Sequence, residues 1–110
     1  MRQASSTRRC EVRLPVALCR CGNTQAHGLT EFISSRAIRF SLNSPIAVRR
    51  GEAVMLFVCL PKQITGGDQV LIRARSSVTG IRRTRKNAGV RFTLTATIQS
   101  YDLIAKTLGV

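Results

Sequence analysis

Apolar and polar residues alternate along most of this chain, and a period of two is typical of half-buried β-strands. The alternation is clearest over residues 11–20, and five more apolar or β-rich runs follow at 29–34, 37–42, 53–60, 69–79 and 89–96. Turn-forming residues separate most of these runs, at 43–45, 50–52, 66–68 and 87–89. Six short strands at this spacing predict an all-β domain, built as a small antiparallel barrel or sandwich.

The two ends of the chain depart from this alternation. Residues 97–108 place apolar side chains at helical spacing, at Ile98, Tyr101, Ile104, Ala105 and Leu108. This spacing predicts a short amphipathic C-terminal helix packed against the barrel. Residues 1–8 are polar and without periodicity, so we expect a flexible basic arm followed by one domain over 9–110.

The charge balance indicates an anionic partner. Eighteen basic residues, fifteen of them arginine, stand against five acidic ones, a formal net charge of +13. The basic run Arg82–Lys86 lies between two predicted strands, where a solvated hairpin tip is expected. Nucleic acid binding through charge alone would be weak, with a dissociation constant of about 10⁻⁴–10⁻⁶ M. One tyrosine and four phenylalanines also give little material for base stacking, so nucleic acid is not the expected partner.

Several other classes of site are not expected. Four cysteines without an export signal favour reduced thiols, at Cys10, Cys19, Cys21 and Cys59. Cys19 and Cys21 are separated by one residue and no second pair follows, so no metal site is predicted near His27. A single histidine and five scattered acids offer no catalytic pair, and we expect neither an enzyme nor a cofactor. No apolar stretch approaches a membrane span of about 20 residues, which favours a cytoplasmic protein without membrane insertion.

Three arginines stand before and within the first predicted strand, at Arg8, Arg9 and Arg13. A guanidinium is planar and forks onto two acceptors, so it suits phosphate oxygens and the edge of guanine better than an ammonium does. Arg9 and Arg13 form an Arg-x-x-x-Arg pair at the mouth of the strand. This position indicates a site for an anionic ligand.

The order of motifs from about residue 8 to 108 resembles the PilZ domain family. Its parts are the arginine arm, the segment Thr-Glu-Phe-Ile-Ser-Ser-Arg-Ala at 30–37, Arg-Gly-Glu at 50–52, Leu-Pro at 60–61 and Gly-Val-Arg-Phe at 89–92. The resemblance implies a six-stranded antiparallel PilZ-like β-barrel with a short C-terminal helix, which binds cyclic di-GMP. It also implies that Arg8, Arg9 and Arg13 hold this nucleotide while Ser34 supplies a hydroxyl from the barrel.

The second binding motif of that family, Asp/Asn-x-Ser-x-x-Gly, is met in part by residues 32–37. Ser34 takes the serine place, but Phe32 replaces the acid or amide and Ala37 replaces the glycine. Loss of a charged hydrogen bond costs about 1.5–3 kcal/mol, and a Cβ at a position of positive φ about 1 kcal/mol. Glu31 can replace the missing acid only through a β-bulge or a one-residue slip. Phe32 is either a core residue or a platform on which a base stacks.

The resemblance therefore implies a cyclic di-GMP receptor or adaptor that acts in trans on an unidentified protein effector, with affinity weakened by Phe32 and Ala37. A degenerate PilZ-like module that binds proteins but not the nucleotide is the alternative. A small basic barrel that binds nucleic acid is a third hypothesis, supported by charge alone.

Overall fold

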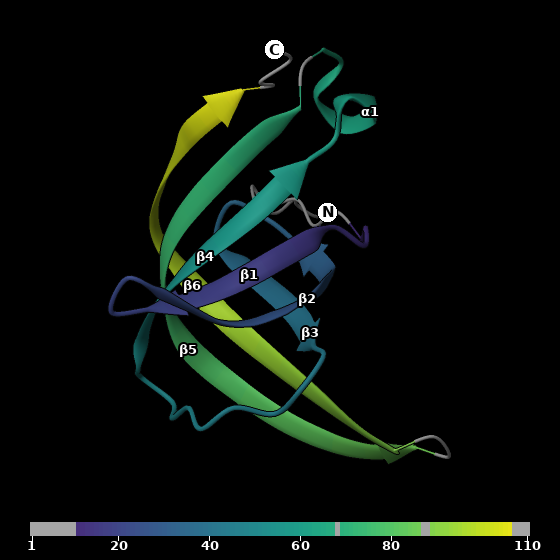
Figure 1. The fold of residues 1–110 in the computed structure, drawn as a ribbon, viewed down its shortest axis with the longest axis vertical. Helices are drawn as coiled ribbons and strands as arrows, with labels where there is room; N and C mark the ends of the chain where they lie inside the picture. Colours follow the sequence, from purple (N-terminus) through teal and green to yellow (C-terminus); the bar gives the residue numbers. More distant parts are fainter. Residues whose placement is uncertain (1–10, 68, 87–88, 107–110) are drawn as a thin grey trace, which may run out of the picture.

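The computed structural model, which describes residues 11–67, 69–86 and 89–106, forms a closed antiparallel β-barrel (Figure 1). Its strands are β1 (Pro15–Arg20), β2 (Asn23–Ile33), β3 (Ala37–Leu42), β4 (Ala53–Leu60), β5 (Val70–Lys86) and β6 (Gly89–Lys106), and a four-residue helix α1 (Lys62–Thr65) follows β4. The order around the barrel is β1-β2-β3-β6-β5-β4. The prediction of a six-stranded antiparallel barrel is confirmed, and the strands at 37–42 and 53–60 have the predicted bounds.

The alternating apolar residues fill the interior of the barrel. Successive side chains of a strand point to opposite faces, so every second residue of each strand enters the core. Phe40, Leu18, Leu56 and Leu94 are fully buried, and Val58 and Val78 complete the centre of this core. The hydrophobic pattern along the chain is thus the pattern of the barrel wall.

The first two strands differ in length from the prediction. β1 begins at Pro15 instead of residue 11, and β2 begins at Asn23 instead of residue 29. Between them, Cys21 and Gly22 both have positive φ, 51° and 81°. Two such residues in succession make the tight turn that suits the twist of a β-hairpin.

The predicted C-terminal helix is wrong, because β6 continues through residues 97–106, and residues 107–108 lie outside the described part. A β-bulge explains the misleading spacing. Ile98 pairs with Ser76, Tyr101 pairs with Ala74, and Gln99 is the extra residue at the register shift between them. The bulge therefore places Ile98 and Tyr101 on one face of the strand although they are three residues apart, which is the spacing of a helix.

The basic run 82–86 is not a hairpin loop but the last part of β5. Pairing of β5 with β4 stops at Ser77 and pairing of β6 with β3 stops at Phe92, whereas β5 and β6 stay paired as far as Lys86 and Gly89. The two strands therefore leave the barrel together as a two-stranded ribbon (Figure 1). We call residues 82–86 and 89–92 the basic ribbon.

Candidate functional site

The outward-facing side chains of β2, β3, β6 and β5 enclose a polar pocket of about 370 Å³, which we call the arginine pocket. It is lined by Glu31, Arg39, Arg50, Gly80, Ile81, Arg82, Thr84, Arg91, Thr93 and Thr95. Four arginines face a single carboxylate there, and three threonines add hydroxyl groups. An excess of guanidinium groups in a hollow attracts a polyanion such as a nucleotide.

The strand register brings these residues together. Arg39 of β3 pairs with Thr95 of β6, which pairs with Gly80 of β5. Two residues along, Thr93 pairs with Arg82. Because alternate residues share a face, side chains that are more than 40 positions apart in the sequence form one polar surface.

A β-bulge in β2 carries Glu31 to this surface. Thr30 pairs with Phe40 and Phe32 pairs with Arg39, so Glu31 is the extra residue between the two pairs. Its carboxylate Oε2 accepts a 2.7 Å hydrogen bond from the Ser41 hydroxyl. The same oxygen lies 4.0 Å from Nη1 of an arginine of β6, Arg91. The bulge therefore puts Glu31 and Phe32, which are adjacent in the sequence, on the same outer face, so Glu31 stands on the side of the motif position that Phe32 occupies.

Phe32 is not a core residue. It pairs with Arg39, whose guanidinium carbon lies 5.3 Å from the centroid of the phenylalanine ring. Its ring is half-buried, and its neighbour Ile33, not Phe32, packs against the core. Of the two alternatives left open for Phe32, the core position is wrong, and the Phe32–Arg39 pair contributes a planar cationic contact on the outer face.

Ser34 organises the turn between β2 and β3. Its Oγ accepts hydrogen bonds from the N–H groups of Arg36 (3.2 Å) and Ala37 (3.1 Å) and donates to the carbonyl oxygen of Ala37 (3.3 Å). One proton and two lone pairs are thus used within the turn. Ala37 opens β3 without a positive φ, so the expected strain at the glycine place of the motif does not arise.

Of the three predicted clamp arginines, Arg8 and Arg9 lie outside the described residues, and Arg13 is exposed. The segment before β1 is held against β2 by buried Thr30. Its Oγ1 accepts a 2.9 Å hydrogen bond from Leu14 N–H and donates to Val12 O at 2.5 Å. Thr30 N–H also donates to Leu14 O at 2.9 Å. This contact extends the pairing of the β1 and β2 segments by one residue beyond Pro15 and Leu29, to Leu14 and Thr30.

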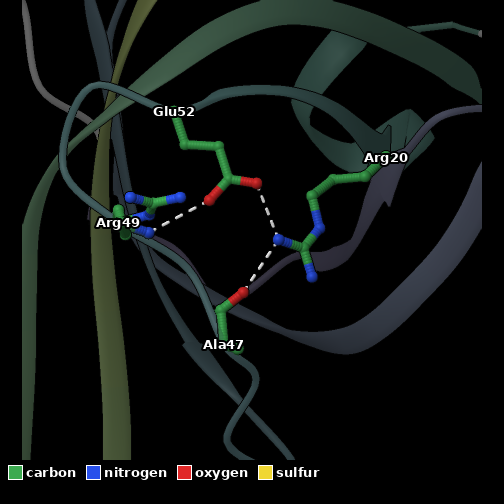
Figure 2. A network of polar contacts seen from close by, with 4 residues as sticks. All are labelled: Arg20, Ala47, Arg49 and Glu52. Atoms are coloured by element: carbon green, nitrogen blue, oxygen red, sulfur yellow. Dashed lines mark hydrogen bonds and ion pairs between the residues drawn. The ribbon is translucent and has the colours of Figure 1, made fainter.

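The loop that carries Arg50 to the pocket is held by Glu52 (Figure 2). Arg20 donates through Nη1 to Glu52 Oε2 at 2.7 Å and to Ala47 O at 2.8 Å, and Arg49 N–H donates to Glu52 Oε1 at 3.0 Å. The hydrogen bond from the Arg20 side chain is the largest cause of the lowered pKa of Glu52, and the hydrogen bond from the backbone N–H of Arg49 is the second. Glu52 is therefore an ionised anchor that ties the end of β1 to the loop before β4.

Four arginines of the pocket were not predicted as site residues from the sequence: Arg39, Arg50, Arg82 and Arg91. Three of them lie on strands, but only Arg39 stands between two buried residues, Ile38 and Phe40, which marks it as outward-facing. That signal does not say which strands are adjacent, so it does not show that the three meet.

Other classes of site find no support in the described residues. Cys19, Cys21 and Cys59 are free thiols, and no three histidine, cysteine or acidic side chains in the described ranges gather as metal ligands. Cys10 lies outside these ranges. None of the helices that the structure describes is long and apolar enough to cross a membrane.

Known proteins resemble this chain in fold more than in sequence. No protein-family model matches it, and no curated protein matches it. Among solved structures it is similar to the inhibitor of motility MotI/DgrA of Bacillus subtilis, with a TM-score of 0.68 and 18% identity over 94% of this chain. The match spans 45% of the length of that protein.

A second solved structure to which the chain is similar is the PilZ domain of YcgR from Escherichia coli, determined with c-di-GMP. The TM-score is 0.65 at 11% identity, and the match covers 89% of this chain and 79% of that domain. The barrel described above therefore has a PilZ-like fold.

Proposed function

We propose that this protein is a PilZ-like receptor that binds cyclic di-GMP on the outer face of β2 and β3 and acts in trans on a protein effector. The likeness in fold to a PilZ domain that was solved with this nucleotide supports the proposal. The observation that carries it is the β-bulge at Glu31, which supplies a carboxylate where the sequence motif lacks one. The proposed activity is binding, not catalysis.

The residues of the outer face match the chemistry of a guanine dinucleotide. An ionised carboxylate accepts hydrogen bonds from guanine N1–H and N2–H groups, which is the proposed role of Glu31. Guanidinium forks pair with guanine O6 and N7 or with phosphate oxygens, a role that fits Arg39 and Arg91. The planar contact of Arg39 with Phe32 presents a flat cation on which a base stacks.

The clamp residues retain their proposed roles. Arg8, Arg9 and Arg13 close over the nucleotide from an arm at residues 1–8 and from the segment that Thr30 holds, and the barrel domain comprises 9–110. Ser34 sets the turn beside the site and offers its hydroxyl to the ligand at the cost of one hydrogen bond within the turn. Ordering of the arm is the proposed signal to the effector.

Calorimetric titration of the protein with cyclic di-GMP tests this proposal. We expect binding that Glu31→Gln and Arg39→Ala each weaken by about 10- to 100-fold, since each removes a charge-assisted contact of about 1.5–3 kcal/mol. Arg13→Ala weakens it as well, if the arm closes over the ligand. The control Arg75→Ala removes an exposed arginine of β5 outside the arginine pocket and leaves the affinity unchanged.

Two results contradict the proposal. Absence of heat at a ligand concentration of about 100 μM excludes a receptor of useful affinity. Binding that survives the Glu31 and Arg39 substitutions unchanged shows that the nucleotide lies elsewhere.

A second candidate function is a PilZ-like module that binds a protein without the nucleotide. In the described residues, β6 beyond Ile98 pairs only with β5, and Tyr101 and Leu103 there are 56% and 61% exposed. An open strand edge with apolar side chains accepts an extended apolar segment of another protein. Under this alternative, a partner protects the backbone amides of 99–106 from hydrogen exchange and cyclic di-GMP produces no heat.

A further inference from the structure

The basic ribbon carries a concentration of positive charge that the arginine pocket does not account for. It contains Arg82, Arg83, Arg85, Lys86 and Arg91, and no acidic residue occurs between positions 69 and 101. Three of the five acids of the chain contact cations or hydroxyls at the barrel: Glu31, Glu52 and Asp102. Only one of these, Glu31, comes near a ribbon arginine, at 4.0 Å from Arg91. The charge of the ribbon is therefore largely uncompensated.

The ribbon is a defined element and not a loose loop. Four consecutive residue pairs join its strands, from Arg83 with Phe92 to Lys86 with Gly89, and Arg82 pairs with Thr93 at its base. At about 3.4 Å per residue, strand 82–86 extends about 17 Å. Figure 1 shows both strands running away from the rest of the barrel beyond Phe92, which is still paired with Leu42 of β3 and buried.

Its arginines occupy both faces. Arg82 and Arg91 line the arginine pocket, on the outer face of the sheet. Arg83 and Arg85 alternate with Arg82 and so point to the opposite face, where the Arg83 guanidinium carbon lies 5.5 Å from the centroid of the Phe92 ring. All four arginines are exposed.

Charge on both faces discriminates between anionic partners. A flat membrane or the surface of an acidic protein touches one face of a ribbon and leaves the other in water. A groove bordered by two phosphate backbones meets both faces at once. The major groove of B-form DNA is about 12 Å wide and admits a two-stranded β-ribbon, whereas the major groove of A-form RNA is too narrow for side chains to read.

We propose that the basic ribbon enters the major groove of double-stranded DNA and binds the flanking phosphates without sequence preference. Four to five phosphate contacts predict that the logarithm of the association constant falls with the logarithm of salt concentration with a slope of about −4. Arg83 and Arg85 do not line the arginine pocket, so substituting them tests DNA binding separately from cyclic di-GMP binding, whereas Arg82 and Arg91 line the pocket and would be shared by the two ligands.

Fluorescence anisotropy of a labelled DNA duplex of about 20 base pairs, titrated with the full chain at several salt concentrations, tests the proposal. We expect the double variant Arg83→Ala/Arg85→Ala to bind about tenfold more weakly at low salt and to have a slope shallower by about 2. The matched control Lys62→Ala/Arg75→Ala removes the same charge from exposed positions outside the ribbon and retains nearly all of the affinity.

Three results of this titration, and of the same titration with duplex RNA or with lipid vesicles, would overturn the proposal of DNA binding. Equal losses in the two double variants show that only overall charge acts, and this overturns the proposal. It is also overturned if duplex RNA binds as tightly as DNA, or if the protein binds vesicles containing phosphatidylserine but not DNA. Arg83 contacts the ring of Phe92, so its loss could also disturb the fold of the ribbon. The variant Arg83→Lys/Arg85→Lys keeps both positive charges, and we expect it to retain the salt slope of the natural protein if the ribbon binds phosphates.

Discussion

The side-chain hydroxyl of Thr30 helps to hold the segment that carries Arg13 against the barrel. The substitution Thr30→Val removes this hydroxyl with little change in the shape of the side chain. Thr30 is fully buried in β2, and its Oγ1 bridges Leu14 N–H and Val12 O. Valine has nearly the same volume but neither donates nor accepts a hydrogen bond. We therefore expect the segment before β1, with Arg13 on it, to loosen.

The magnitude follows from the two hydrogen bonds. Each contributes about 0.5–1.5 kcal/mol net, and a buried donor left without an acceptor costs about 1–3 kcal/mol. Leu14 is only 4% exposed, so water does not readily replace the threonine oxygen at its N–H, whereas Val12 is only half-buried. We expect Thr30→Val to lower the free energy of unfolding by about 2 kcal/mol.

Urea unfolding at equilibrium measures this change. With a slope of about 1–2 kcal/mol/M, a loss of 2 kcal/mol lowers the midpoint by about 1–2 M. The control Thr97→Val makes the same chemical change at an exposed position of β6 and stays within about 0.5 kcal/mol of the natural protein. Thr30→Ser keeps the hydroxyl and loses only a methyl group, about 0.8 kcal/mol.

The reasoning is refuted if Thr30→Val is no more destabilising than Thr97→Val. A second readout is hydrogen exchange of the Leu14 amide, which should accelerate in Thr30→Val and not in Thr30→Ser. If the clamp is the site proposed above, the affinity for cyclic di-GMP also falls under conditions in which the variant stays folded.

Two further predictions concern the barrel wall and its anchor. A Cβ added at Gly28 would collide with the carbonyl oxygen of Ser41, so Gly28→Ala should lower the free energy of unfolding by more than about 3 kcal/mol. The control Gly67→Ala has open space around its Cβ and should lower it little. An unchanged melting temperature of Gly28→Ala would contradict this close approach. The hydrogen bond from Arg20 lowers the pKa of Glu52 in the folded protein, so its contribution to stability is present at neutral pH and is lost as the pH falls below the ordinary glutamate range and through the lowered folded value. Urea midpoints at neutral and acidic pH should therefore differ less in Glu52→Gln than in the natural protein, and an identical pH dependence would show that this contact does not contribute.

The local sequence pattern predicted the bounds of two strands correctly. The run at 37–42 alternates, the run at 53–60 is apolar throughout, and the two match β3 and β4. The prediction was wrong over 97–106 because a bulge at Gln99 shifts the alternation by one residue. Bulges form between two paired strands, so the sequence of one strand does not reveal them.

The candidate site was predictable only in part. The Arg-x-x-x-Arg pair and Ser34 follow from a resemblance in motif order, but the sequence left Phe32 open between a core residue and a stacking platform, and left open whether Glu31 shares its face. In an unbroken strand, two adjacent residues face opposite sides. The observed bulge places both Glu31 and Phe32 on the outer face, with Phe32 opposite Arg39.

The sequence by itself determined that this chain forms a basic all-β domain, a barrel or a sandwich, because apolar patterning and turn residues act over a few neighbouring positions. Only the tertiary structure decided which strands are adjacent, and adjacency creates the arginine pocket from β2, β3, β5 and β6. It also decided that β5 and β6 extend beyond the strands paired with them, so that residues 82–86 form part of a projecting ribbon instead of a loop. Register and strand length depend on pairing between distant segments, which no local pattern contains.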